Sequence, residues 1–181
     1  MMSLFRAEVV KAVLAWLVIL GVLGGLGALA FVYSGFFNVA ATTVDSAPLQ
    51  WLLVTAREAS IQLHARDIEA PTLGGAEQVE RGFRFFRQEC AMCHNPPGRE
   101  PTAMSAGLNP KAPDLPELVE DMTDAELFWV TRNGIRFTGM PAWATSSYGD
   151  EMIWDVVTYM RASVDMQAAD YDALDQRLPP D

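Results

Sequence analysis

The sequence predicts an all-α protein: an N-terminal apolar helix, a helical spacer and a small helical domain. Residues 12–33 form one block without a charged side chain, and apolar residues recur at helical spacing through residues 48–68. Thr123 and Glu126 have the spacing of a capping box, and no βαβ pattern is present. With 181 residues, half of them hydrophobic, the chain can bury one compact domain plus one further element.

The apolar block predicts one membrane-crossing helix. It is as long as the roughly 20 residues needed to cross about 30 Å of hydrocarbon. Arg6 and Lys11 on the short N-terminal flank favour a cytoplasmic N-terminus, so residues 1–33 are expected to be that terminus and an anchor. The alternative is a cleaved secretory signal, since Ala-Leu-Ala at 28–30 has the form of a cleavage site, but the apolar core of a signal usually has only about 7–15 residues. Both alternatives place the rest of the chain outside the cytoplasm.

Small residues follow one another at four-residue spacing inside this block, at Gly21 and Gly25 and again at Gly24 and Ala28. This spacing lets a second helix approach closely. Glycine is also common in single anchors, so a helix–helix partner and a lone anchor both stay open.

Residues 34–76 are expected to form a helical spacer, whose helix spans 48–68. This helix packs on the domain, on the membrane surface or on a partner, and the sequence does not choose among the three. Gly-Gly at 74–75 is typical of a boundary between domains. The domain is expected over residues 77–163, and residues 164–181 are expected to be a C-terminal tail.

The chain is acidic, with 23 acidic and 13 basic residues. Only Arg6, Glu8 and Lys11 precede Ser34, which leaves 22 acidic and 11 basic residues, a net charge of −11, beyond the anchor. No basic patch points to nucleic acid. An acidic surface favours a partner with a basic docking face, and it serves solubility equally well.

Cys90-Ala91-Met92-Cys93-His94 has the Cys-x-x-Cys-His pattern of covalent haem attachment. In this pattern two thiols add to two vinyl groups, and the adjacent histidine binds the iron from one face. The pattern uses both cysteines of the chain. A disulfide over so short a loop constrains little, and a thioredoxin-like redox pair is expected beside a βαβ unit. We therefore predict one covalently bound haem c, with His94 as an iron ligand.

Met140 is the expected second iron ligand. It lies in a Gly-Met-Pro sequence, where glycine and proline hold an irregular loop that can aim one thioether inward. A thioether opposite histidine raises the reduction potential of haem iron. Among the nine methionines, Met104 and Met122 are the alternatives.

With these motifs, residues 77–163 resemble a class I c-type cytochrome. The attachment motif ends the expected first helix, and Gly82 and Phe86 have the Gly-xxx-aromatic spacing that such cytochromes use where their first and last helices cross. Trp154 and Tyr159, in the expected last helix, are the implied partners at this crossing.

The resemblance also implies contacts around the iron. Pro113-Asp114-Leu115 is similar to the Pro-x-Leu of the family, in which the proline carbonyl accepts a hydrogen bond from the ligating histidine, here His94. Gly-Met-Pro-Ala-Trp at 139–143 resembles membrane-anchored, single-haem bacterial cytochromes, some of them related to cytochrome subunits of terminal oxidases. The resemblance implies a single-pass protein of the bacterial inner membrane, with its haem domain in the periplasm.

Two further side chains are expected to contact the haem propionates. The indole N–H of Trp143 is a hydrogen-bond donor, and the guanidinium of Arg136 can pair with a carboxylate. His64, the only other histidine, is expected to be a partly solvated helix residue rather than an iron ligand.

Haem iron with two protein ligands has no open coordination position, so the site predicts single-electron transfer rather than an enzymatic reaction. We expect a membrane-anchored electron carrier between respiratory or photosynthetic partners. One alternative is a haem-c subunit of a larger membrane redox complex. Another is a ligand-binding haem sensor or peroxidase, which requires that Met140 does not hold the iron.

Overall fold

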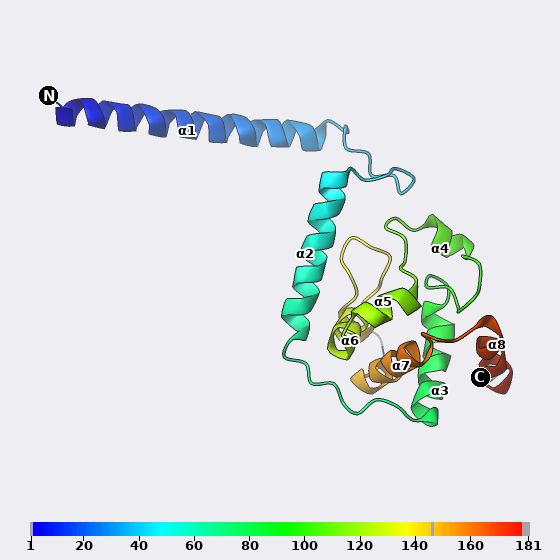
Figure 1. Cartoon of the computed structure of the whole chain (residues 1–181). Coiled ribbons are helices and arrows are strands. Elements are labelled where there is room, and N and C mark those ends of the chain that lie inside the picture. The colour runs from blue at the N-terminus through cyan, green and yellow to red at the C-terminus, as the bar shows by residue number, and fades with distance from the viewer. Residues whose placement is uncertain (1, 146, 179–181) are drawn as a thin grey trace. The chain divides into compact units, whose positions relative to one another are not determined.

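The structure, a computed structural model, describes residues 2–145 and 147–178, with the backbone alone for residues 2–5. The described residues form helices and connecting segments without a strand, which confirms the all-α prediction (Figure 1). The chain divides into two compact units, Met1–Thr43 and Val44–Asp181. The expected spacer helix, the domain and the C-terminal tail all belong to the second unit, although residues 179–181 of that tail lie outside the described residues.

The helices of the second unit follow one another in this order: α2 (Ala47–Ala65), α3 (Ala76–Phe85), the π-helical turn η1 (Phe86–Cys90), α4 (Ala103–Gly107), α5 (Leu115–Asp121), α6 (Asp124–Asn133), the 3₁₀ turn η2 (Trp143–Thr145), α7 (Asp150–Ala162) and α8 (Ala168–Arg177).

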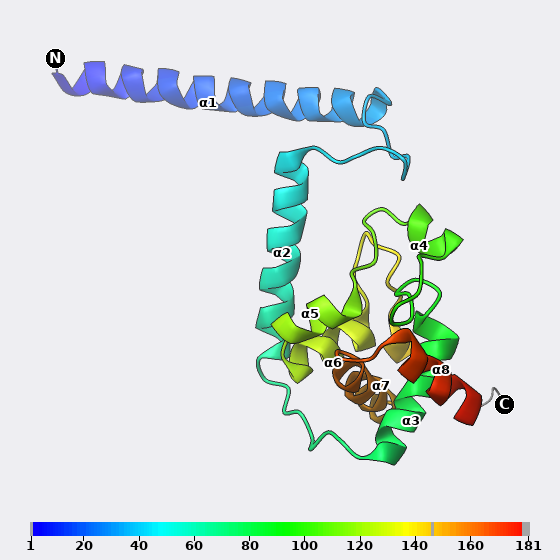
Figure 2. The same ribbon diagram turned by 45° about the vertical axis from the view of Figure 1, so that its right-hand side comes forward.

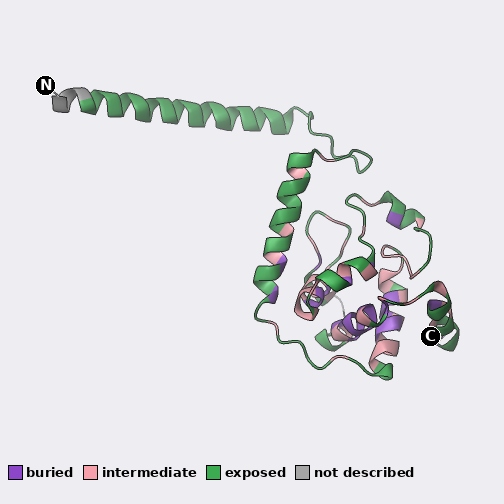
Figure 3. Ribbon diagram, in the orientation of Figure 1, coloured by how far each residue is buried: buried purple, intermediate pink, exposed green. Residues whose placement is uncertain are grey.

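The first unit is built around α1 (Met2–Tyr33). Every described side chain of this helix is exposed, and Figure 3 shows it green beyond its grey start. The span from Arg6 to Tyr33 has the length and apolar composition of a membrane-crossing helix. A signal sequence near the N-terminus can have the same length and composition. A helix that is apolar on all sides and satisfies its own backbone hydrogen bonds suits a lipid environment.

The second half of α2 packs on the domain. Ile61 and Ala65, one turn apart, are buried where this helix contacts α6. His64 is exposed, and its ring stacks on that of Trp129 in α6, with the ring centroids 5.4 Å apart. Of the three positions that the sequence leaves open for the spacer helix, its second half therefore occupies the one against the domain (Figures 1 and 2).

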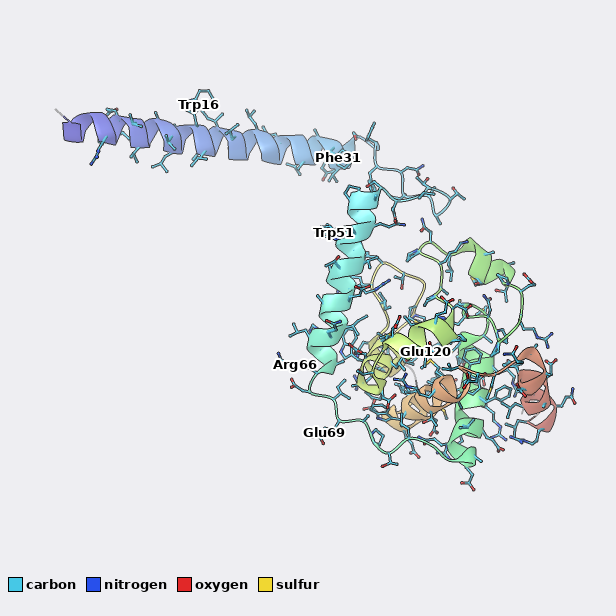
Figure 4. The ribbon with its side chains drawn as sticks, in the orientation of Figure 1. Trp16, Phe31, Trp51, Arg66, Glu69 and Glu120 are labelled. Carbon is cyan, nitrogen blue, oxygen red and sulfur yellow. The ribbon has the colours of Figure 1, made fainter. Side chains whose placement is uncertain are left out.

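The first half of α2 is apolar and exposed. Its large exposed side chains include Trp51, labelled near the start of the helix in Figure 4, and Leu52 and Leu53. The two halves of this helix thus have different surroundings.

Helices α3 and α7 cross at a glycine. A Cβ built on Gly82 would lie 2.0 Å from the carbonyl oxygen of Asp155, so a larger residue would separate the helices. Beside it, Arg81 donates to the buried Asp155 carboxylate at 2.7 and 3.0 Å. One turn later, the rings of Phe86 and Tyr159 lie 5.0 Å apart. The crossing that the resemblance implies is present, with Tyr159 as its partner.

Helix α6 is fixed by its cap and by an aromatic contact. Thr123 Oγ1 accepts a hydrogen bond from the Glu126 N–H, and the Glu126 carboxylate accepts one from the Thr123 N–H, which confirms the capping box. Trp154 stacks on Phe128 with the ring centroids 4.1 Å apart. Trp154 thus joins α7 to α6 and leaves the α3 crossing to Tyr159.

The expected C-terminal tail contains a helix, α8, that packs back on α3. Tyr171 is buried, and its ring lies 5.2 Å from that of Phe83. Arg87 donates to Asp175 at 2.8 Å and also to the carbonyl of Leu178, which is itself buried. This helix therefore covers the outer side of the chain just before the attachment motif.

The hydroxyl of Tyr159 is a buried polar group that finds no hydrogen-bond partner in the described part of the chain. Burial raises the pKa of this phenol, so it stays neutral. We predict that Tyr159→Phe leaves the free energy of unfolding unchanged or raises it by up to about 1 kcal/mol, because the substitution removes an unsatisfied group and keeps the ring. Urea unfolding followed by circular dichroism measures this. A loss of more than about 1 kcal/mol would mean that the hydroxyl binds a buried water.

Candidate functional site

A cavity of about 420 Å³ lies inside the second unit, within the size range of small-molecule sites. Its walls come from the attachment loop, α5, α6, the loop before η2, α7 and the second half of α2. Seven of the eight residues expected at the site line it: Cys90, Cys93, His94, Pro113, Leu115, Met140 and Trp143.

After η1 the chain makes a tight turn that brings both cysteines and the histidine to the cavity. The N–H groups of Cys93 and His94 both donate to the Cys90 carbonyl, at 3.0 and 2.9 Å. The two cysteines are free thiols. Burial, with a smaller effect of Glu89, raises the pKa of the Cys90 thiol to about 12, whereas a redox-active cysteine needs a lowered pKa. This thiol therefore lacks the character of a thioredoxin-like pair.

The His94 ring is oriented by a backbone carbonyl. Its Nδ1 lies 3.2 Å from the Pro113 oxygen, the contact that the Pro-x-Leu resemblance implies. Because a carbonyl only accepts hydrogen bonds, Nδ1 carries the proton and Nε2 keeps its lone pair for a metal ion. Burial lowers the pKa of the imidazole, and the Pro113 hydrogen bond opposes this by raising it. The net result favours the neutral ring, which is the form that binds metals.

Met140 lies in a loop that is closed by its own hydrogen bonds. Its N–H donates to Thr138 Oγ1 at 3.1 Å, and its carbonyl accepts from the Ile135 N–H at 3.2 Å. Gly134 has a φ of 66°, and a Cβ there would lie 2.6 Å from the Pro141 carbonyl carbon. The chain folds back tightly at this point and brings Met140 to the cavity from a different segment than His94.

Two other methionines also line the cavity. Met160 is buried in α7, and Met122 is the C-cap of α5. Met104 lies on α4 with 51% of its surface exposed and is not part of the described cavity wall. Of the two alternatives to Met140 as iron ligand, Met122 alone contacts the cavity.

The structure separates the two residues expected at the propionates. Trp143 lines the cavity, with its ring 5.2 Å from that of Phe85. Arg136 is exposed and does not reach the described cavity wall. Its neighbour Phe137 has a φ of 63° and is 79% exposed, so the turn that directs Met140 inward directs these two side chains outward.

Sequence reasoning missed the contribution of α2 to the wall, which consists of Arg57, Glu58, Ile61 and Gln62. It also missed Lys111, in the segment before Pro113. The four-residue spacing of Ile61 and Ala65 indicates a buried stripe on the spacer helix, but it does not say what covers that stripe.

The donor set fits a covalently attached haem. Two thiols, a neutral imidazole with a free Nε2 and a thioether share one cavity, whose other walls include Leu115, Val130 and Val156. Thiols for attachment and a His/Met pair for the iron are the groups that haem c uses.

Residues 77–160 match the protein family described as cytochrome C oxidase, cbb3-type, subunit III. This segment is a class I c-type cytochrome domain. A comparison with curated proteins finds no match to the chain. The cytochrome domain contains both cysteines, His94 and Met140, and its family implies haem c and points to electron transfer. Helices α2 and α8 lie outside the matched segment, although both pack against the cytochrome domain.

Proposed function

We propose that this chain is a membrane-anchored monohaem cytochrome c that transfers single electrons between redox proteins. The observation that carries the proposal is the convergence of Cys90, Cys93, His94 and Met140 on one cavity. Two thiols, one imidazole and one thioether are the attachment sites and axial ligands of an electron-transferring haem c.

Each side chain at the site has a separate role. Cys90 and Cys93 would hold the cofactor through thioether bonds, and His94 Nε2 would bind its iron while the Pro113 carbonyl keeps the imidazole ring in place. Met140 would supply the second protein ligand to the iron, and Leu115 adds an apolar side chain to the cavity wall. Haem c supplies a one-electron iron couple. Ligation by both His94 and Met140 would let the haem change oxidation state with little rearrangement of the protein and without a bound substrate.

The membrane part of the proposal depends on α1. Its exposed apolar surface and its length suit a single crossing, and Arg6 and Lys11 on its N-terminal flank favour a cytoplasmic start. The haem domain then lies on the periplasmic side of a bacterial inner membrane.

A fixed subunit of a larger redox complex is the second candidate. The family that matches the domain is described as an oxidase subunit, and the first half of α2 leaves Trp51, Leu52 and Leu53 exposed. A carrier and a fixed subunit share one site chemistry and differ in how they meet their partner.

Ionic strength separates the two candidates. Beyond the anchor the chain has a net charge of −11, and exposed charges are screened beyond roughly 8 Å at physiological salt. A diffusing carrier needs a new encounter for each electron, so we predict that its second-order rate of electron transfer to a basic redox protein falls as salt is added. Stopped-flow spectroscopy at the haem band, across a salt series, measures this rate.

Other outcomes of the salt series exclude parts of the proposal. Turnover in native membranes that is indifferent to salt would identify a fixed subunit. A rate that rises with salt would exclude a basic docking partner. A protein that exchanges electrons with no redox mediator at all would contradict the electron-transfer function.

A further inference from the structure

Part of the cavity wall comes from outside the cytochrome domain. Arg57, Glu58 and Ile61 on α2 line the cavity, whereas the family match begins at residue 77. The chain therefore adds to its cytochrome domain a wall that the matched segment does not contain.

The second half of α2 is held in this position by side-chain packing against α6. Ile61 is 7% exposed and Ala65 is 2% exposed, and the stacked rings of His64 and Trp129 fasten the same end of the helix to α6. The His64 ring is itself fixed through Nδ1, 2.7 Å from the Ser60 carbonyl. The burial of two apolar side chains and the ring stack both favour the attachment of α2 to α6.

Arg57 is one helical turn before Ile61 on the face that meets the cavity. Arg57 and Lys111 are the two Lys or Arg residues on the described cavity wall. The Arg57 guanidinium lies 3.5 Å from the Glu58 carboxylate, and the Arg57 side chain is 38% exposed, so this ion pair is long and weak. The guanidinium is therefore available to a stronger anionic partner inside the cavity.

The position of α2 suits the anionic end of the cofactor. In Figures 1 and 2, α2 and the end of α3, which leads into the attachment loop, lie on opposite sides of α5 and α6. Haem c has its two thioether-forming substituents on one half of its ring and its two propionates on the other half. Attachment at Cys90 and Cys93 therefore directs the propionates away from the attachment loop.

We propose that α2 closes the haem pocket on its propionate side and that Arg57 positions the cofactor by pairing with a propionate. This inference rests on the proposed binding of haem c. The Arg57 charge and the exclusion of water by α2 both disfavour the extra positive charge of oxidised iron, so both raise the reduction potential. The same pairing lowers the pKa of the propionate.

Redox titration of the full-length haem protein at a series of pH values tests this role. In Arg57→Gln the reduction potential should fall, and its pH-dependent region should move to higher pH because the propionate loses its cation. Arg57→Lys should restore most of both properties. Arg66→Gln, at the end of the same helix, is the matched control: Arg66 is exposed, pairs with Asp67 and is labelled in Figure 4.

A second variant tests the wall without the Arg57 charge. Ala65→Glu places a carboxylate at a position that is 2% exposed and should detach α2 from α6, so the potential should fall in this variant too. Hydrogen exchange of the α2 amides reports the detachment directly. A detached α2 with an unchanged potential would overturn the proposal.

Two results of the redox titrations would contradict the proposed role of Arg57. If Arg57→Gln leaves the potential and its pH profile unchanged, or shifts them no more than Arg66→Gln does, Arg57 has no propionate partner. If Lys111→Gln moves the pH profile and Arg57→Gln does not, the partner is Lys111 and the proposal fails. In each case the protein keeps its attached haem and its redox activity, so the proposed function stands. A protein without attached haem would contradict the function itself.

Discussion

Replacing Cys90 and Cys93 together by alanine should abolish covalent haem attachment. These are the only two thiols of the chain, and both line the cavity. Without them no thioether can form, and any haem that remains is held by His94, Met140 and packing alone. Extraction with acidified acetone, followed by haem staining of the denatured protein, measures the bound fraction, which should fall from nearly complete to none.

Met92→Ala is the matched control for this experiment. Met92 lies between the two cysteines and is 53% exposed, so its replacement should leave the covalent haem in place. Haem that is extractable from the unmodified protein would contradict attachment, and so would haem that stays bound to the double variant.

Replacing Met140 by alanine should open the iron to external ligands. The unmodified protein should show the weak far-red band of Met–iron coordination when oxidised, and it should bind no carbon monoxide when reduced. In Met140→Ala the band should disappear, the reduced protein should bind carbon monoxide, and the reduction potential should fall because the thioether raises it. Visible spectroscopy and redox titration measure all three changes.

Met122→Ala and Met104→Ala are the controls for Met140. Met122 also lines the cavity and Met104 does not, so the pair separates a second ligand candidate from a surface methionine. Both should keep the far-red band. If the band is lost in Met122→Ala instead, the iron ligand is Met122. Carbon monoxide binding by the unmodified reduced protein would favour a sensor or peroxidase.

The features that depend on neighbouring residues were predictable from the sequence. The capping box at Thr123 depends on four consecutive residues, and it is present as expected. The Gly82 crossing was also predictable, although it joins distant helices, because only glycine permits so close an approach and the resemblance supplies its partner. The roles of the site residues toward haem stay predictions.

The features that depend on unpatterned long-range contacts were not predictable. Helix α8 has two large apolar side chains, Tyr171 and Leu174, and its attachment depends on Tyr171, which meets Phe83 far back in the sequence. The wall formed by α2 requires contact with α6 across about 60 residues. Arg136 lies only four residues before Met140, and it points outward because Phe137 has a positive φ. Phenylalanine rarely adopts a positive φ, so the sequence does not indicate this turn.

The π-helical turn η1 decides which way the attachment loop faces. In a continuous α-helix, residues four apart share one face, so Gly82, Phe86 and Cys90 would all point at α7. In η1 the Ala91 N–H instead donates to the Phe86 carbonyl five residues back, at 2.9 Å, which puts Ala91 above Phe86. Cys90 is thereby rotated by one residue, about 100°, out of the packing face and toward the cavity. The segment from α3 through η1 thus turns one face toward α7 and another, which carries Cys90, toward the cavity. Deletion of one residue within η1 would turn the Cys90 thiol toward the crossing of α3 and α7.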